Sequence, residues 1–241
     1  MYDTRPTDPK FMDSKVTPLT EEEATYYLRT AWKKIYGVYP LRDNLALLWA
    51  QSLGETGRWK LLRCNNWGNI KRRGDWKWTS YDAGEVINGK HQMFYPYHPQ
   101  THFAAWDSPL EGAEAYIRFL SGKKRYKKAW IELMAGDPVA YCRELKAGGY
   151  FTADLAHYTR GVVRLTKEFK RKSDALMAWE PPAPEPEPEA PPEPPEAEPE
   201  PPSEPTPEPE PEPVEKLDSA PSVGPFWLII KFLKNLFKFG K

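Results

Sequence analysis

Glu55 closes an apolar stretch and is the residue of this sequence best placed for acid–base chemistry. Residues 45–53 read Leu-Ala-Leu-Leu-Trp-Ala-Gln-Ser-Leu, and Gly54 and Gly57 follow closely, which predicts a buried helix over 42–54 that ends beside the glutamate. Desolvation at such a place raises the pKa of a carboxyl group, and a carboxyl that keeps its proton near neutral pH can act as a general acid. The alternative is an ordinary solvated glutamate at a helix end.

Other chemistries find less support in the sequence. His98 and His102 flank a Pro-Gln loop instead of sharing a helix face, so we predict no metal site, and no cofactor motif is present. There is no Gly-x-Ser-x-Gly elbow. Cys64 and Cys142 are far apart and are expected to be free thiols, with Cys142 packed in a helix core.

Aromatic side chains are frequent, with 10 Trp and 13 Tyr, and sugar rings stack on such side chains. Glycoside cleavage needs an acid for the leaving oxygen and a group that stabilises oxocarbenium charge. Glu55 fits the first role, and Glu85, Asp75 and Asp82 are candidates for the second. Several of the aromatic residues gather in the same region: Trp59, Trp67, Trp76, Trp78, Tyr81, Tyr95 and Tyr97.

The elements that must position these residues predict an α+β fold, a mainly helical domain with a small β-lobe. Thr20 and Glu23 form a capping box, and Asn88-Gly89 between two β-rich runs indicates a hairpin. The expected helices cover 21–36, 42–54, 109–120, 126–135, 138–147 and 152–172, and the expected strands cover 76–79, 85–87, 92–95 and 102–106.

Composition divides the chain into four parts. We predict an irregular leader over 1–17, the α+β domain over 18–175, an extended and disordered Pro/Glu-rich linker over 176–223, and a short amphipathic helix over 224–241. Residues 180–215 contain 13 Glu and neither Lys nor Arg, which favours polyproline II over a packed core. Residues 1–179 contain 29 basic and 20 acidic residues, and this excess suits an anionic partner.

The C-terminal segment places lysines on one narrow stripe and apolar residues everywhere else. Lys231, Lys234 and Lys238 form the stripe, and Phe226 and Trp227 belong to the apolar remainder. A helix of about 15 residues with this pattern is suited to lie in a membrane interface. The alternative is a helix that docks into a protein groove. No run of 18 apolar residues that would cross a bilayer is present.

An ordered set of motifs resembles the glucosaminidase family of peptidoglycan hydrolases, which includes flagellar rod-assembly muramidase domains, autolysins and phage lysins. The resemblance covers about residues 20–170. The motifs are Glu55-Thr-Gly-Arg-Trp, Asn65-Asn-Trp-Gly-Asn-Ile-Lys71, Gly84-Glu-Val-Ile-Asn-Gly89, Phe103-Ala-Ala-Trp-Asp-Ser108, Pro109-Leu-Glu-Gly-Ala-Glu-Ala-Tyr116, Arg125-Tyr126 and Gly149-Tyr-Phe-Thr-Ala-Asp-Leu-Ala-His-Tyr158.

The resemblance implies a lysozyme-like fold and assigns roles to individual residues. Glu55 matches the general acid, Glu85 the second acidic residue of the lobe hairpin, and Tyr158 a tyrosine that lines the catalytic cleft. For Glu85 the role stays open between nucleophile and water-positioning group, with the substrate's acetamido group assisting in the second case. Asn66, Trp67 and Tyr150 match substrate-binding positions, although the family's Asn-Leu-Phe-Gly is Asn66-Trp67-Gly68 in this chain.

The implied activity is hydrolysis of the β-1,4 bond between N-acetylglucosamine and N-acetylmuramic acid, with peptidoglycan and a membrane surface as partners. With no secretory signal visible, we expect a phage or virion-associated lysin, carried on the virion or released from the host cytoplasm to the envelope. The alternative is a wall-binding module with a degenerate lysozyme-like fold. Nucleic-acid binding has only net charge in its favour and is not expected, and the sequence makes no prediction of oligomeric state.

Overall fold

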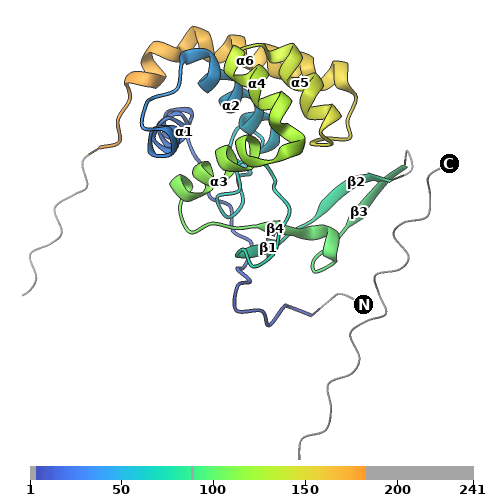
Figure 1. Ribbon diagram of the computed structural model, residues 1–241. Coiled ribbons are helices and arrows are strands. Elements are labelled where there is room, and N and C mark those ends of the chain that lie inside the picture. Colours follow the sequence, from blue (N-terminus) through green and yellow to red (C-terminus); the bar gives the residue numbers. More distant parts are fainter. Residues whose placement is uncertain (1–3, 88–89, 183–241) are drawn as a thin grey trace, which may run out of the picture. The chain divides into compact units, whose positions relative to one another are not determined.

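The computed structural model describes residues 4–87 and 90–182 (Figure 1). The predicted C-terminal helix, and the predicted linker from residue 183 onward, lie outside these residues. The helices are α1 (Glu21–Tyr36), α2 (Arg42–Glu55), α3 (Pro109–Gly122), α4 (Lys127–Ala135), α5 (Pro138–Ala147) and α6 (Leu155–Ala178), with two short 3₁₀ turns, η1 (Pro99–Thr101) and η2 (Lys124–Tyr126). The strands are β1 (Trp78–Ser80), β2 (Ala83–Ile87), β3 (Lys90–Phe94) and β4 (His102–Ala104).

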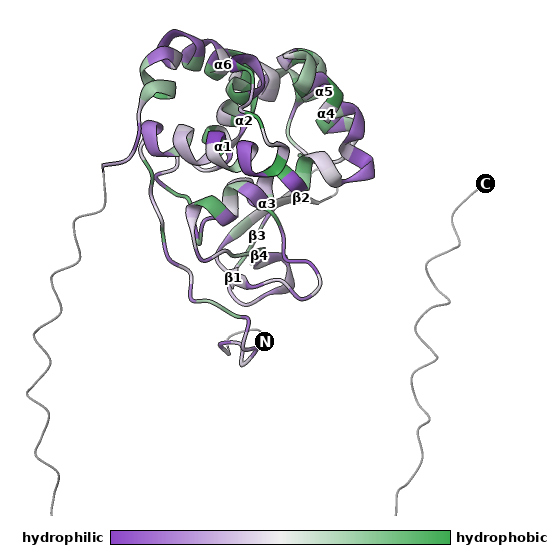
Figure 2. Ribbon diagram, turned by 60° about the vertical axis from the view of Figure 1, so that its left-hand side comes forward, coloured by the Kyte–Doolittle hydropathy of each residue, from purple (hydrophilic) through white to green (hydrophobic). Residues whose placement is uncertain are grey.

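The helices gather at one end of the domain and the strands at the other, which confirms the α+β fold (Figures 1 and 2). Helix α2 is the centre of the helical part. Every residue from Asn44 to Leu53 is buried, and the helix packs against α1, α4 and α6. An apolar helix with neighbours on all sides hides its whole circumference, which explains why its sequence carries no polar face.

The helix starts follow the predicted caps. The Thr20 hydroxyl accepts from the Glu23 backbone N–H and the Glu23 carboxylate accepts from the Thr20 N–H, so the capping box is formed. Ser108 caps α3 and Asp137 caps α5. Helix α6 is shifted from its predicted range because Asp154 accepts from the His157 N–H and starts the helix there.

The far end of α6 extends beyond the predicted domain boundary at residue 175. Its last turns bury Ser173 and Leu176, and Arg29 of α1 donates to the Met177 carbonyl and pairs with Glu180. These contacts with α1 support two further helical turns that the local pattern alone does not reveal.

The β-lobe consists of two antiparallel pairs. Strand β1 pairs with β4, and β2 pairs with β3 in a register that sets Glu85 opposite Gln92 and Ile87 opposite Lys90. Two residues therefore join β2 to β3, as a hairpin requires, which confirms the pairing predicted from Asn88-Gly89. Thr79, Phe103 and Ala104 are buried where β1 and β4 pair.

The predicted leader is irregular, but it is part of the folded domain. Phe11 bridges to Trp78 in parallel and Val16 bridges to Arg63 in antiparallel fashion. The Asp8 carboxylate accepts from the Trp78 indole at 2.9 Å and pairs with Arg72 at 2.7 Å. Residues 8–17 thus run along the lobe and along the loop that leads to it, a pairing over long sequence separation that local propensity does not encode.

Candidate active site

Glu55 is the last residue of α2, where the buried helix ends. Burial is the largest influence on its carboxyl group and raises the pKa from 4.5 to about 7. Hydrogen bonds from Tyr158 and Asn69 act in the opposite direction because they stabilise the ionised form. The negative end of the α2 dipole adds to the effect of burial. The predicted rise in the pKa is confirmed, and a carboxyl with this pKa holds a proton for part of the time at neutral pH.

Tyr158 reaches Glu55 from α6. Its hydroxyl donates to Oε1 of Glu55 at 3.1 Å. The ring stacks on Phe151, with the two centroids 3.8 Å apart and the planes at 12°. Burial and the charge of Glu55 both raise the pKa of Tyr158 well above its usual value, so the phenol stays protonated and remains a donor. The structure thus brings together two of the three residues that were assigned catalytic roles.

Glu85 lies in β2, and the backbone register is what the structure describes of it. The other two candidates for the second carboxylate are exposed. Asp75 is paired with Lys10 at 3.6 Å, and Asp82 follows β1 on the surface. Glu85 therefore remains the predicted second acidic residue.

Asn66, assigned to substrate binding, is fully buried. Its Oδ1 accepts from the Ile70 N–H at 2.8 Å, and its Nδ2 donates to the carbonyls of Ile70 and Ala104 at 2.9 and 3.0 Å. These bonds hold the loop after α2 against β4. The side chain has no surface left for a ligand, so the structure corrects the predicted role to one of support.

Trp67 is corrected in the same way. It is fully buried, its indole N–H donates to the Pro109 carbonyl at 3.0 Å, and its own carbonyl accepts from Ser52 Oγ at 2.8 Å. Tyr150, half-buried, donates from its hydroxyl to the Gly68 carbonyl at 3.2 Å. All three predicted binding residues thus contact one loop, and each holds its backbone.

Asn69 and Tyr81 were not singled out as site residues by the sequence. The side-chain amide of Asn69 donates to the main-chain carbonyl of Glu55 at 2.6 Å, and the Tyr81 hydroxyl donates to Oδ1 of Asn69 at 3.1 Å. The signal was present for Asn69, because asparagine is the residue other than glycine that most readily adopts a left-handed backbone, and φ here is 47°. Nothing local marked Tyr81 apart from its place among the lobe aromatics.

A polar cluster lies beneath Glu55 in the core. Gln51, one helical turn earlier on α2, accepts at Oε1 from the hydroxyl of Tyr116 at 2.8 Å and from that of Tyr141. The charge of Glu55 contributes to the raised pKa of both tyrosines. The predicted greasy surroundings of Glu55 therefore include a buried hydrogen-bonded network on the side that faces the core.

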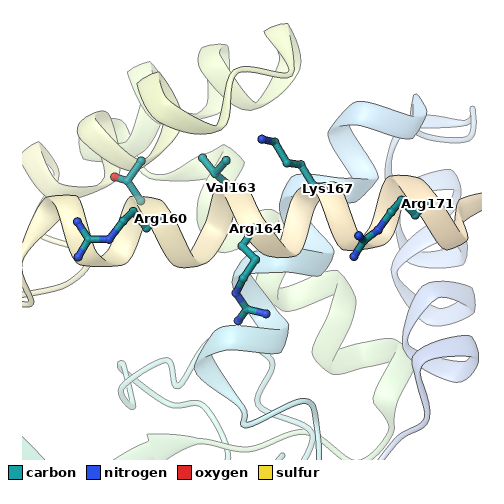
Figure 3. Close-up of a pocket in the computed structure, with 6 residues that line it drawn as sticks. Arg160, Val163, Arg164, Lys167 and Arg171 are labelled. Carbon is teal, nitrogen blue, oxygen red and sulfur yellow. The ribbon is translucent and has the colours of Figure 1, made fainter.

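A separate hollow of about 400 Å³ lies along α6 (Figure 3). Its lining comprises Thr159, Arg160, Val163, Arg164, Lys167 and Arg171. Arg164 approaches Glu168 at 3.8 Å, whereas the other three cations have no ion pair within residues 4–87 and 90–182. None of the predicted site residues lines this hollow. It locates part of the positive charge that composition assigned to the domain.

The remaining predicted sites have separate outcomes. Cys64 and Cys142 are free, buried thiols, as expected. The described part of the chain holds no group of three His, Cys, Asp or Glu arranged for a metal. Across the same part, no helix has the length and apolar character needed to cross a bilayer. Phe226, Trp227, Lys231, Lys234 and Lys238, predicted to meet a membrane, lie outside the described residues.

Comparison with known proteins defines the class of the molecule. Residues 32–171 match the glucosaminidase family, described as mannosyl-glycoprotein endo-beta-N-acetylglucosaminidase, and this match spans more than half of the chain. The chain belongs to that family and is a glycoside hydrolase, which confirms the resemblance read from its motifs. No curated protein sequence matches the chain.

Solved structures agree with this assignment at the level of the fold. A mutant peptidoglycan hydrolase from Sphingomonas sp. A1 is similar over 64% of this chain and 99% of its own, with 22% identity and a TM-score of 0.50. The catalytic domain of the autolysin Auto from Listeria monocytogenes matches over 66% of this chain and 89% of its own, with 20% identity and a TM-score of 0.45. A C-terminally truncated glycoside hydrolase domain of Salmonella typhimurium FlgJ matches over 63% and 98%, with 19% identity and a TM-score of 0.43.

Proposed function

We propose that this protein is a peptidoglycan hydrolase that cleaves the β-1,4 bond between N-acetylglucosamine and N-acetylmuramic acid, with Glu55 as its general acid. The observation that carries the proposal is the Glu55 carboxyl at the end of α2, whose pKa is raised to about 7 and which accepts from Tyr158 at 3.1 Å. Membership of the glucosaminidase family and the motif resemblance support the choice of substrate.

In the proposed reaction the Glu55 proton passes to the glycosidic oxygen as the bond from that oxygen to C1 of N-acetylglucosamine breaks. Positive charge develops at C1 and is relieved when water adds there, with its proton returning to a carboxylate. Tyr158 stabilises the ionised Glu55 left after the first transfer, because its hydroxyl donates to Oε1. Glu85 on β2 is proposed as the second acidic group, acting as nucleophile or through a positioned water.

The proposal is tested by mass spectrometry of purified peptidoglycan digested with the wild-type protein and with Glu55→Gln. Reducing N-acetylglucosamine ends from the wild type are expected, and the variant should be at least ~100-fold slower because it has no proton to donate. Reducing N-acetylmuramic acid ends would refute the bond assignment. A wild type that binds peptidoglycan and releases no fragment would establish the wall-binding module instead.

We further propose a phage or virion-associated lysin whose C-terminal segment meets a membrane. The support lies in the sequence, in the 13 glutamates of 180–215 and in the lysine stripe of Lys231, Lys234 and Lys238. Deleting 224–241 should leave the digestion of isolated wall unchanged and weaken the lysis of whole cells. Equal lysis of whole cells by the two proteins would refute the membrane role. Flotation of the full-length protein with anionic vesicles, and not with neutral ones, would separate lipid binding from docking to a protein.

A further inference from the structure

The last carbonyl of α2 belongs to Glu55 itself. The four final carbonyls of a helix have no partner within the helix, so each one needs a donor from elsewhere. For Glu55 this donor is Asn69, whose Nδ2 lies 2.6 Å from the carbonyl oxygen. The same amide also interacts with the Glu55 side chain and lowers the pKa of the carboxyl. One side chain thus fixes both the backbone and the acid group of this residue.

Tyr81 fixes the orientation of the Asn69 amide. Its hydroxyl donates to Oδ1 of Asn69 at 3.1 Å, and this bond leaves Nδ2 directed at Glu55. Reversing the amide would set two donors against each other and would remove the donor from the helix carbonyl. The orientation of Asn69 is therefore determined from both of its ends.

Tyr81 is in turn held by the β-lobe. Its ring stacks on Phe103 of β4, with centroids 4.1 Å apart and planes at 7°. The Lys71 ammonium lies 4.0 Å from the centroid of the Phe103 ring. Tyr81, Asn69 and Glu55 consequently form a continuous path from the lobe to the end of α2.

The loop that carries Asn69 is itself fixed on both sides of that residue. Asn66 binds its backbone before and after the turn, and Ser52 and Tyr150 donate to the Trp67 and Gly68 carbonyls. A Cβ atom added at Gly68 would lie 2.8 Å from the Tyr150 hydroxyl, so the loop has little room to shift. Asn69 is presented to Glu55 by a rigid support.

We propose that Asn69 and Tyr81 are positioning residues that hold Glu55 from the lobe side while Tyr158 holds it from α6. Glu55 then sits between two donors on two different elements, and its carboxyl is kept in one orientation for proton transfer. This inference rests on the proposed function, because it takes Glu55 to be the acid. Neither residue is required to touch substrate, since both act through Glu55.

The test compares three variants with one control. Asn69→Gly removes the amide and tolerates the left-handed backbone, and Asn69→Asp keeps the acceptor for Tyr81 while removing the donor. Tyr81→Phe keeps the stacked ring and removes the hydroxyl. Tyr95→Phe is the matched control, because Tyr95 is a lobe tyrosine with 64% of its surface exposed. The readouts are kcat and KM on purified peptidoglycan across pH, and the thermal midpoint.

Asn69→Gly should lower kcat by about 10-fold or more with KM changed by less than ~2-fold, since misplacing a reacting group costs rate more than binding. The alkaline limb of the pH profile should move to higher pH, because the lost amide had lowered the pKa of Glu55. Tyr81→Phe should change both quantities in the same direction and by less. A merely structural role would lower the thermal midpoint and leave the pH profile in place.

A titration without substrate separates this inference from the proposed function. The pKa of the Glu55 carboxyl, followed by carbon-13 NMR, should rise in Asn69→Gly and stay at the wild-type value in Tyr95→Phe. An unchanged pKa together with an unchanged kcat would overturn the positioning role. A wild type that cuts no glycan would refute the proposed function, while the NMR titration would still decide whether Asn69 and Tyr81 act on Glu55.

Discussion

The two segments that meet at Glu55 are held in place by different kinds of interaction. Helix α2 is positioned by apolar packing, with Leu45, Leu47, Leu48 and Trp49 completely buried. The loop over 63–71 is positioned by side chains that bond to its backbone, and Cys64, Asn65 and Asn69 adopt positive φ. Apolar packing is not directional and tolerates exchanges of equal volume, whereas each hydrogen bond of the loop needs one particular side chain. The acid therefore stands on a tolerant element and is oriented by an exacting one.

Asn66→Ala should have the largest effect on stability. It leaves buried backbone groups of Ile70 and Ala104 without partners, and we expect a loss of about 4 kcal/mol in the free energy of unfolding. Leu48→Met, a change of similar volume in α2, should cost less than about 1.5 kcal/mol. Denaturant unfolding of both variants measures the difference. Equal losses would contradict the contrast between loop and helix.

Glu55→Gln should stabilise the protein in a pH-dependent way. The folded carboxyl has a pKa of about 7 against 4.5 when unfolded, so the folded state binds more protons in that window and loses stability as pH rises through it. The variant avoids this loss. Its advantage should be small near pH 4 and reach about 3 kcal/mol by pH 8. Urea unfolding at both pH values measures it, and an advantage that does not vary with pH would contradict burial of the acid.

Gly112→Ala should displace the loop from the side of α3. A Cβ atom there would lie 2.0 Å from the Asn65 carbonyl oxygen, which is backbone and cannot rotate away. We expect a loss of about 2 kcal/mol together with reduced glycan cleavage. Gly122→Ala, on the same helix, meets nothing within 4 Å and serves as the control. Thermal unfolding of the pair gives the comparison, and it would fail if both variants matched the wild type.

Glu168→Gln should have the smallest effect. Glu168 pairs with Arg58, which follows α2, and this hydrogen-bonded pair lowers its pKa from 4.5 to about 2. The pair contributes stability that is present above pH 4.5 and is lost as pH falls toward 2. Because Arg58 is partly exposed, we expect about 1 kcal/mol at pH 7. Unfolding at pH 7 and pH 3 should show the difference shrinking with acid, and a constant difference would point to lost packing.

Local signals in the sequence were enough for the frame of the domain. The caps at Thr20, Ser108 and Asp137 and the apolar run before Glu55 each act within a few residues, so the helix starts and the buried acid could be predicted. The roles of Asn66 and Trp67 could not. Their types fit a binding site and a loop support equally well, and which of the two they serve depends on where β4 and α3 pack against the loop.

Contacts over long sequence separation were the second gap. The register of residues 8–17 against Trp78 and Arg63 is set by the folded lobe, and so is the path from Tyr81 through Asn69 to Glu55. Neither arrangement has a periodicity to detect. Positive φ at Asn69 was the one feature that residue type alone favoured.

The N-terminal segment also makes the protein its own reporter of local opening. The Cys64 thiol is buried and donates to the Asp13 carbonyl at 3.5 Å, and the Lys15 carbonyl lies 3.8 Å away. Cys142 is buried in α5, and burial raises the pKa of its thiol to about 11. A small alkylating reagent would reach Cys64 when residues 13–15 lift from the loop, and Cys142 only when helices separate. Two rates of labelling in one molecule would thus time the release of the segment and the opening of the core.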